Sequence, residues 1–318
     1  MSHAQTQLSA AGASFPAPLY QRWAVEFKKT NPNIEVSYQS IGSGAGVKQF
    51  ISKTVDIGAS DAAMNDGELA KVPGALMVPT TAGSVVLGFN LPGIEDVKIS
   101  RNALRDIVMG KIKKWNDPEL VKANPGVNLP DLAISFAYRS DGSGTTFVFT
   151  TYLAAMSSEF DDEVGVAKQV SWPVGVGGKG NEGVTALIKQ IPGSIGYIEY
   201  GYATHNKVPM ATLENKAGNY IKPTPESGSA TLASIELPAN MRAWAGDPAG
   251  ADDYPIVSFT WMLLYPSYGA EKGPDVKKFL DYVLSPEAQA LAPELGYITL
   301  PASVVEKCKA AVATIEVK

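Results

Sequence analysis

Short apolar runs that alternate with amphipathic segments are the feature that most restricts what this chain can fold into. The runs are rich in β-branched and aromatic residues, as strands are, and the segments between them repeat apolar residues at helical spacing. We expect strands at residues 34–38, 55–59, 85–91 and 132–138, and helices at 16–31, 46–53, 145–156, 184–191 and 275–284. Strands that alternate with helices in this way predict an α/β fold with mostly parallel sheets.

The length of 318 residues suits about two domains. Two long apolar runs, residues 85–91 and 256–265, are expected to carry the chain between two lobes. Residues 215–253 lack periodicity and are rich in small residues, so we expect a surface excursion there, with a short helix at 241–244. The predicted divisions are lobe I at 1–88 and 259–318, lobe II at 89–258, and hinge crossings near 85–93 and 255–265.

Charge and composition exclude several classes of function. The 27 basic and 32 acidic residues give a net charge of −5, whereas a nucleic-acid-binding protein is expected to be basic. No apolar run approaches the length of a membrane-spanning helix. Cys308 is the only cysteine, and His3 and His205 are the only histidines, so neither a His/Cys metal cluster nor an intrachain disulfide can form. A Ser–His catalytic pair would need His205, which we expect to be an exposed loop residue. We therefore expect no catalytic residue, no metal and no cofactor.

The start of the chain permits two interpretations. It lacks the basic and apolar regions of a signal peptide, which taken alone indicates the cytoplasm. The residues Met1 to His3, followed by small residues, instead look like a replacement start on a mature secreted chain. The residues alone leave both interpretations open.

Four glycine-rich polar loops follow strands or open helices. The first turn of a helix has about four N–H groups without intrahelical partners and a partial positive charge, so a loop of this kind can hold an anion. Glycine admits a ligand to the backbone, and a Ser or Thr hydroxyl adds a donor. The alternative is that these hydroxyls only cap their own helices. The loops are Gly12–Phe15, Gly42–Gly46, Gly58–Asp61 and Arg139–Thr146.

Arg139 adds a cation to the last of these loops. It ends a predicted strand just before a Gly-Ser-Gly sequence, so it can make a bidentate, charge-assisted contact of about 1.5–3 kcal/mol with an anion. Asp141 can hold the guanidinium in place, or it can be an ordinary turn carboxylate. The basic cluster of Lys111, Lys113 and Lys114 is expected to be a solvated face.

A fifth loop suggests a different function. Gly175 to Gly180 matches the G-x-G-x-x-G pattern, and Glu199 stands near the place of a ribose-binding acid. The preceding residues contain Pro173, which makes them a poor parallel strand, so we do not expect a dinucleotide site here. A phosphoryl-handling or dinucleotide-dependent enzyme remains the alternative function, although no nucleophile–base pair supports it.

Motifs spread over nearly the whole chain resemble those of the periplasmic phosphate-binding proteins that feed ABC-type phosphate transporters. Each motif is weak by itself, but the set and its order along the chain are specific. These motifs are Gly12–Pro18, Gly42–Gly44, Asp56–Asp61, Gly110–Trp115, Arg139–Thr145, Gly177–Asn181, Gly193–Tyr197 and Leu300–Val305.

The resemblance implies a two-lobed periplasmic-binding-protein architecture that closes on one phosphate in the cleft between the lobes. Each lobe would hold a mixed, mostly parallel sheet flanked by helices. The protein would be non-catalytic, monomeric and periplasmic, with the membrane components of an ABC transporter as its partner and no nucleic acid. Arsenate, which shares the shape and protonation of phosphate, is a candidate second ligand. The phosphate-binding residues carried over by position are Ser14, Phe15, Ser43, Asp61, Arg139, Ser143, Gly144 and Thr145, with Asp141 supporting Arg139.

Asp61 suggests how such a site selects its ligand. A carboxylate repels a fully deprotonated oxyanion and helps only when the ligand brings a proton to share. Phosphate carries a proton near neutral pH and sulfate does not, so a buried acceptor rejects sulfate because that acceptor is left unpaired. Asp61 would therefore act as a filter, and its alternative role is a helix cap or a surface carboxylate.

Overall fold

The computed structural model describes residues 5–318, which divide into two compact units. The terminal unit contains the described residues up to Ala82, together with Leu237–Ala243 and Phe259–Lys318. The central unit contains Gly83–Glu236 and Trp244–Ser258. The chain therefore passes between the units at both ends of the segment 237–243 as well as within two strands.

The observed bounds differ from the predicted lobes in two segments. Residues 83–88 belong to the central unit because strand β4 (Leu76–Phe89) pairs there with strand β8 (Ser194–Glu199). Residues 237–243 belong to the terminal unit, where the Nε1 of Trp261 donates to the carbonyl of Met241 at 2.8 Å. A crossing within β4 thus precedes the predicted range 85–93.

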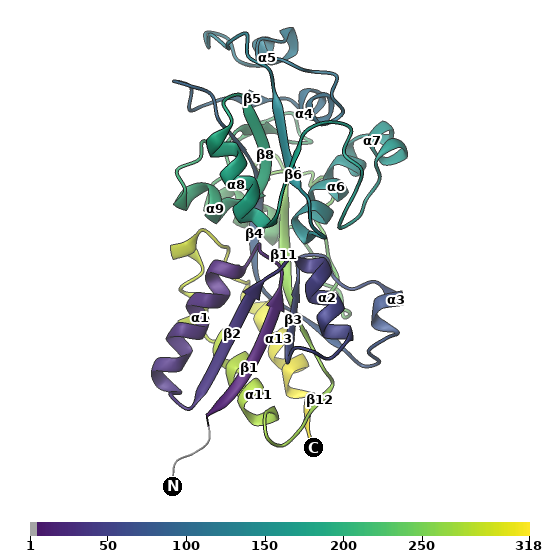
Figure 1. The fold of residues 1–318 in the computed structure, drawn as a ribbon, viewed down its shortest axis with the longest axis vertical. Coiled ribbons are helices and arrows are strands. Elements are labelled where there is room, and N and C mark those ends of the chain that lie inside the picture. The colour runs from purple at the N-terminus through teal and green to yellow at the C-terminus, as the bar shows by residue number, and fades with distance from the viewer. Residues whose placement is uncertain (1–4) are drawn as a thin grey trace. The chain divides into compact units, whose positions relative to one another are not determined.

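The terminal unit is an α/β unit with a mostly parallel sheet. Its elements, with β4 and β11 shared between the units, are β1 (Thr6–Gly12), α1 (Ala17–Thr30), β2 (Ile34–Ser40), α2 (Ser43–Ile51), β3 (Ile57–Ser60), α3 (Asp66–Leu69), β11 (Val257–Leu264), β12 (Ser267–Tyr268), α11 (Gly273–Val283), α12 (Pro286–Gln289), the 3₁₀ helix η1 (Pro293–Leu295), α13 (Ala302–Ala313) and β13 (Glu316–Val317). Strand β1 pairs in parallel with β2 and β3, and β11 runs antiparallel to β3. Helix α1 lies beside β2 and α2 beside β3 (Figure 1). The carboxyl ends of β1, β2 and β3 therefore share one edge of the sheet.

Helix α1 buries the aromatic stripe that its sequence predicts. Tyr20, Trp23 and Phe27 are each at most 1% exposed. The indole Nε1 of Trp23 donates to the carbonyl of Ala288 at 2.8 Å, which joins α1 to α12. Burial of three aromatic side chains on one face explains why this helix packs firmly onto the sheet.

Two glycines let the backbone segments at the carboxyl edge come close together. A Cβ on Gly46 would lie 2.5 Å from the Cα of Gly12 and 2.7 Å from the carbonyl oxygen of Ala59. Gly12 has a φ of 151° and its carbonyl accepts from the amides of Ile41 and Gly42, both at 2.9 Å. The start of α2 is therefore fixed directly against the ends of β1 and β3.

The central unit has the same mixed plan. Its elements are β5 (Lys98–Ile99), α4 (Arg101–Val108), α5 (Pro118–Ala123), β6 (Ser135–Arg139), α6 (Gly144–Met156), α7 (Ser158–Glu163), β7 (Val176–Gly178), α8 (Gly180–Gln190), β8, α9 (Tyr200–His205), β9 (Thr212–Glu214), β10 (Tyr220–Ile221) and α10 (Pro225–Ala233). Strand β6 pairs in parallel with β7 and β8, and β4 runs antiparallel to β8. A small second sheet has the order β10-β9-β5. The predicted α/β class with mostly parallel sheets is confirmed in both units.

Two local predictions are wrong. Residues 241–244 form no helix, because Met241 takes a left-handed backbone with φ of 57°. The excursion 215–253 instead contains β10 and helix α10, which begins with a capping box between Thr224 and Ser227 and with Pro225 in its first turn.

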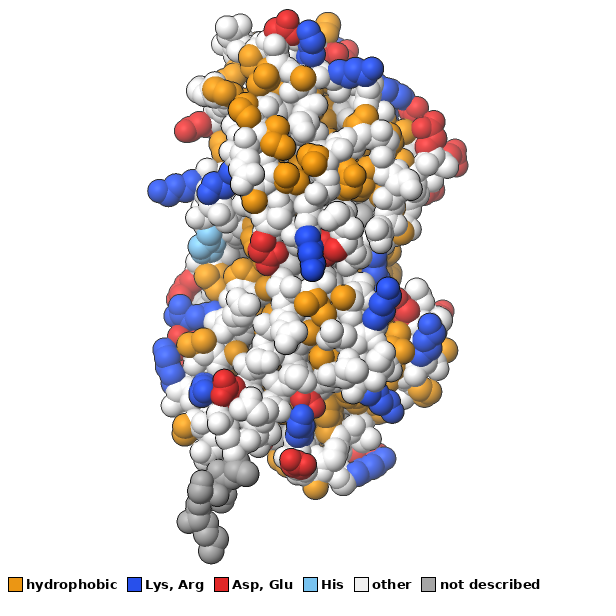
Figure 2. Space-filling model, in the orientation of Figure 1, with side chains coloured by type: hydrophobic (Ala, Val, Ile, Leu, Met, Phe, Trp, Pro, Cys, Tyr) orange, Lys and Arg blue, Asp and Glu red, His pale blue; other side chains and the backbone are white. Residues whose placement is uncertain are grey.

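Within residues 5–318, no helix is both long and apolar enough to cross a bilayer. On the face drawn in Figure 2, basic and acidic side chains are interspersed instead of gathering into patches of one sign. This pattern agrees with the small negative net charge.

Candidate functional site

The loop after β1 is held by hydrogen bonds to its carbonyl groups. Tyr38 donates from its hydroxyl to the carbonyl of Ala13 at 2.5 Å, and Tyr297 donates to the carbonyl of Phe15 at 2.7 Å. A trans peptide directs its N–H opposite to its C=O, so the amide of Ser14 points away from Tyr38. Ser14 is 1% exposed and Phe15 fully buried. The sequence did not indicate the two tyrosines, which lie outside the loop that they fix.

Ser43 and Asp61 meet within the terminal unit. Ser43 is the first residue of α2, and the residue before it, Gly42, has a φ of 87° and no side chain with which to cap the helix. The amide of Asp61 donates to the Oγ of Ser43 at 3.2 Å, and that hydroxyl reaches the Asp61 Oδ2 at 3.5 Å. The loops after β2 and β3 are thereby joined by side-chain hydrogen bonds.

Asp61 is a buried carboxylate with a hydroxyl partner on a distant strand. It is 1% exposed, so it is neither a surface aspartate nor a solvated cap. The Oγ1 of Thr260, in β11, donates to its Oδ1 at 2.8 Å. Sequence reasoning missed Thr260, because only the antiparallel pairing of β11 with β3 brings it to Asp61.

Arg139 and Asp141 form a buried ion pair in the central unit. The Nε and Nη2 of Arg139 donate to the two carboxylate oxygens of Asp141, each at 2.7 Å, while the Arg139 side chain is 1% exposed. Burial pushes the pKa of Asp141 upward, but the Arg139 hydrogen bonds and charge, together with the amide of Gly180, outweigh it and leave that pKa below its usual range. The guanidinium is therefore held in one orientation by an ionised partner.

The start of α6 supplies donors beside this cation. The Oγ of Ser143 caps the helix by accepting from the amide of Thr146 at 3.0 Å, and the Ser143 amide donates to the carbonyl of Lys168 at 2.7 Å. Gly144 and Thr145 are the next residues, and their amides have no acceptor within the helix. The Oγ of Ser143 therefore caps its own helix, as the alternative interpretation of these loops expected. Because the Ser143 amide is also used, the hydroxyl hydrogen is the donor that Ser143 can offer to a ligand.

The hydroxyl of Thr145 is oriented by two donors. Its Oγ1 accepts from the Nη1 of Arg139 at 3.3 Å and from the Nδ2 of Asn181 at 3.2 Å. With both lone pairs engaged, the hydroxyl hydrogen of Thr145 is left to be donated. Asn181 also accepts from the amide of Glu199 at 2.9 Å, so it joins the ends of α8 and β8. Asn181 was not among the predicted site residues, although it stands in one of the motifs that carry the resemblance.

Other candidates from the sequence have structural roles. Residues Val176–Gly178 of the G-x-G-x-x-G match form strand β7, which pairs with β6, so the match is not a loop between a strand and a helix. His205 is exposed at the end of α9, where its Nδ1 lies 2.7 Å from the carbonyl of Gly201. Cys308 is fully buried, and burial raises the pKa of its thiol to about 12.

The basic cluster is solvated, as expected. Lys111 forms an ion pair with Glu159, and the Nζ of Lys114 lies 2.7 Å from a carboxylate oxygen of Asp131. All three lysines of the cluster are exposed. Within residues 5–318, no group of three or more His, Cys, Asp or Glu side chains is placed to hold a metal ion.

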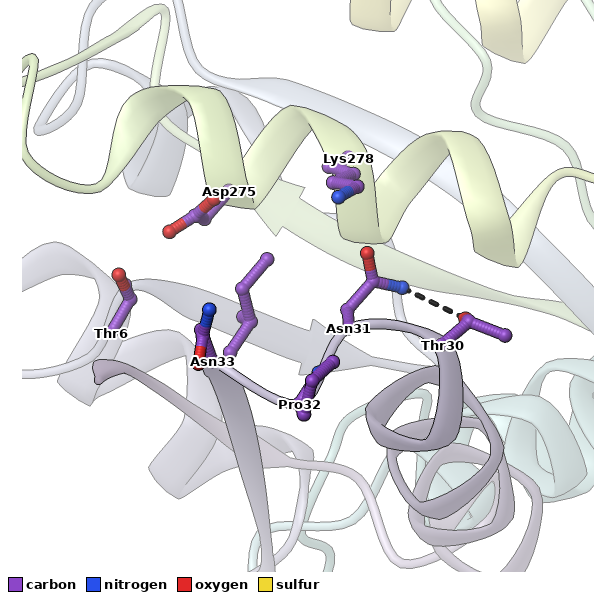
Figure 3. Close-up of a pocket in the computed structure, with 8 residues that line it drawn as sticks. Thr6, Thr30, Asn31, Pro32, Asn33, Asp275 and Lys278 are labelled. Carbon is purple, nitrogen blue, oxygen red and sulfur yellow. Dashed lines mark hydrogen bonds between the residues drawn. The ribbon is translucent and has the colours of Figure 1, made fainter. Parts of the chain in front are cut away.

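A hollow in the terminal unit lies at the other edge of the sheet (Figure 3). Thr6 and Ile34 line it at the amino ends of β1 and β2, and Lys278 of α11 reaches it. Asn31 caps the end of α1 there by donating from its Nδ2 to the carbonyl of Phe27 at 3.0 Å. The predicted anion-binding residues are not among its lining residues.

The structure therefore brings the predicted residues together in two groups. The terminal group consists of Ser14, Phe15, Ser43 and Asp61, at the carboxyl ends of β1 to β3. The central group consists of Arg139, Asp141, Ser143, Gly144 and Thr145, at the carboxyl end of β6. Ligands of open α/β sheets bind at this edge, so each group stands where an anion site is expected.

Comparisons with known proteins agree with this plan. The PBP superfamily domain matches residues 2–287. The phosphate-binding protein PstS of Pasteurella multocida is 44% identical over 317 residues, which cover 97% of this chain and 90% of that protein. The PstS of Haemophilus influenzae is 43% identical, and the match covers 95% of this chain and 91% of that protein.

A solved phosphate-binding protein from Stenotrophomonas maltophilia shares the fold, with a TM-score of 0.75 and 21% identity over 96% of this chain and 93% of that one. The chain belongs to the PBP superfamily and, within it, to the family of the phosphate-binding proteins PstS.

Proposed function

We propose that this protein binds inorganic phosphate without chemical change and delivers it to the membrane components of an ABC-type transporter. The proposal extends to a monomer that works in the periplasm and that also accepts arsenate, since arsenate has the shape and protonation of phosphate. The observation that carries it is the buried cation Arg139, fixed by Asp141 beside the first amides of α6. The names of the full-length relatives support the same ligand.

Both the terminal group and the central group would contribute to binding. Each group stands at the carboxyl ends of parallel strands in its own unit, and the chain crosses between the units within β4 and β11. Rotation about such crossings closes the two units on the ligand, as in other hinged binding proteins. Closure removes water and strengthens each hydrogen bond to the anion.

Each residue would have its own task. The amides of Gly144 and Thr145, with the hydroxyl hydrogens of Ser143 and Thr145, would donate to phosphate oxygens beside the Arg139 guanidinium. From the terminal group, the backbone of Ser14 and Phe15 and the residue Ser43 would supply further donors. A dissociation constant in the micromolar range needs about 8 kcal/mol, which several charge-assisted bonds can supply.

Asp61 would accept the proton that phosphate brings. Its Oδ1 already accepts from Thr260, so the carboxyl group is held as an acceptor in a buried place. Sulfate near neutral pH has no proton to give and would leave Asp61 facing an oxyanion without a hydrogen bond. The cost of that unpaired contact would exclude sulfate.

Isothermal titration calorimetry at neutral pH tests this function. We expect one phosphate per chain, competition by arsenate, and little heat with sulfate. Equal affinity for phosphate and sulfate would remove the role of Asp61, and absence of phosphate binding would remove the function. A rise in melting temperature with NAD, or turnover of an aryl phosphate, would favour an enzyme instead.

A further inference from the structure

A buried row of hydroxyl groups leads from Asp61 into the interior of the terminal unit. Thr260 donates to the Asp61 Oδ1 at 2.8 Å and lies near the hydroxyl of Tyr20, whose pKa it influences. The Tyr20 hydroxyl makes a short hydrogen bond with the Oγ1 of Thr80. Thr80 and Thr260 are fully buried, and Tyr20 and Asp61 are each 1% exposed. Four polar side chains thus lie close together in a region closed to water.

The direction of the bond to Asp61 follows from the number of hydrogens. A hydroxyl has one hydrogen to donate, and Thr260 gives its own to the carboxylate. The Oδ1 of Asp61 therefore has a hydroxyl partner that lies on another strand, in a place closed to water.

We propose that Thr260 is a positioning residue that determines selectivity between protonated and fully deprotonated oxyanions. By donating to Oδ1, it fixes the orientation of the carboxyl group and directs Oδ2 to the ligand. A carboxylate held in this way favours an oxyanion that brings a proton over one that has none. This inference rests on the proposed function and assigns the cause of its selectivity to a residue that does not touch the ligand.

The surroundings of Asp61 fit this role. The hydroxyls of Ser43 in α2 and Thr260 in β11 are hydrogen-bonded to the Asp61 carboxylate. Tyr20 of α1 lies near Asp61, and its hydroxyl is hydrogen-bonded to Thr80 of β4. Tyr20 is the titratable group among them. Burial raises its pKa well above the ordinary value, so it remains a neutral donor over the range in which oxyanions are tested.

The substitution Thr260→Val tests the proposal, because it removes the hydroxyl and keeps the shape. The measurement is the ratio of sulfate to phosphate dissociation constants, by calorimetry at several values between about pH 5 and 8. We expect the ratio to fall by about tenfold or more, which is the worth of a hydrogen bond to a charged group. A merely structural role would weaken the binding of both anions equally and leave the ratio unchanged.

Three variants make the outcome decisive. Thr260→Ser retains the hydroxyl and should restore the wild-type ratio. Thr231→Val removes an equally buried threonine hydroxyl in the central unit, which donates to the carbonyl of Tyr254 at 2.8 Å, and should leave the ratio unchanged. Thr260→Ala removes the same hydroxyl with a smaller side chain and should also lower the ratio. If Thr260→Val does not fold, Thr260→Ala decides the question.

The failure of the inference is distinct from the failure of the proposed function. A wild-type protein that does not bind phosphate overturns the function. A wild-type protein that binds phosphate and rejects sulfate, beside Thr260→Val or Thr260→Ala variants with an unchanged ratio, overturns the role of Thr260.

Discussion

In the proposed function, the terminal group and the central group would have different tasks in the recognition of an anion. The central group has the buried cation Arg139, whose charge is balanced by Asp141. The terminal group has no cation and contains a buried carboxylate, Asp61, held by hydroxyls from Ser43 and Thr260. On this proposal, the central unit would supply the attraction to any oxyanion, and the terminal unit would supply the requirement for a proton. The comparison therefore predicts that mutations can change affinity and selectivity separately.

The largest effect is expected from Arg139→Met, which removes the charge and retains much of the volume. Phosphate affinity should fall by about two to three orders of magnitude, because a buried, charge-assisted contact is lost and Asp141 loses its partner. Calorimetry measures the loss. Arg105→Met is the control, since Arg105 makes a similar bidentate pair with Asp106 at 2.8 and 3.0 Å on α4, and its affinity should be unchanged. Equal losses in the two variants would contradict the assignment of charge to Arg139.

Asp61→Asn should change selectivity more than affinity for phosphate. The amide can donate to sulfate and accepts less well from phosphate, so the ratio of their dissociation constants should fall by about tenfold. Competition binding with both anions measures it. Asp56→Asn is the matched control, because Asp56 is a carboxylate of the same unit that pairs with Lys272 at 2.9 Å. An unchanged ratio in Asp61→Asn would show that discrimination does not reside in the terminal group.

Gly46→Ala probes the packing that builds the terminal group. Alanine normally favours a helix, but here its Cβ would meet Gly12 and Ala59 at 2.5 and 2.7 Å. We expect a loss of about 1–3 kcal/mol in the free energy of unfolding, measured by urea denaturation. Gly269→Ala, in the same unit, has no atom within 4 Å of the added Cβ and should change stability by less than about 0.5 kcal/mol. A stable Gly46→Ala variant would mean that the loops can shift apart.

The smallest effect is expected from Asp141→Asn, and it should depend on pH. The pKa of Asp141 is lowered in the folded protein, so the ion pair adds stability above the ordinary value of 3.8 and loses it as the pH falls through the folded pKa. The variant should therefore be less stable than wild type by about 1 kcal/mol near neutral pH. Melting curves between about pH 3 and 7 should show the two proteins converging at the acidic end. A constant difference across that range would contradict the ionised pair.

The sequence predicted those parts of the fold and site that depend on nearby residues. Apolar spacing located α1, and the glycine-rich loops marked the ends of β1, β3 and β6, because both signals are local. Thr260 and Tyr297 were missed because they reach Asp61 and Phe15 only through tertiary packing. No short sequence window contains both members of either pair.

The errors have the same physical origin. The G-x-G-x-x-G match became a strand because β6 offers it a parallel partner, which a sequence pattern does not reveal. Residues 241–244 were predicted as a helix, but the segment is held by contacts such as the ion pair of Arg242 with Asp66 at 2.7 Å. Helix α10 has a local sequence signal, the capping box of Thr224 and Ser227. It was missed because the composition of the surrounding segment is typical of loops.

The long separation between Asp61 and Thr260 has a consequence for the order in which the protein is made. The two residues stand 199 positions apart, and β11 is synthesised after nearly all of the central unit. Before the ribosome reaches β11, the emerging chain already contains every residue of the central group. Thr260, which donates to Asp61, has not yet been added. The central group can thus form during translation, whereas the hydrogen bond between Asp61 and Thr260 forms only after β11 has left the exit tunnel.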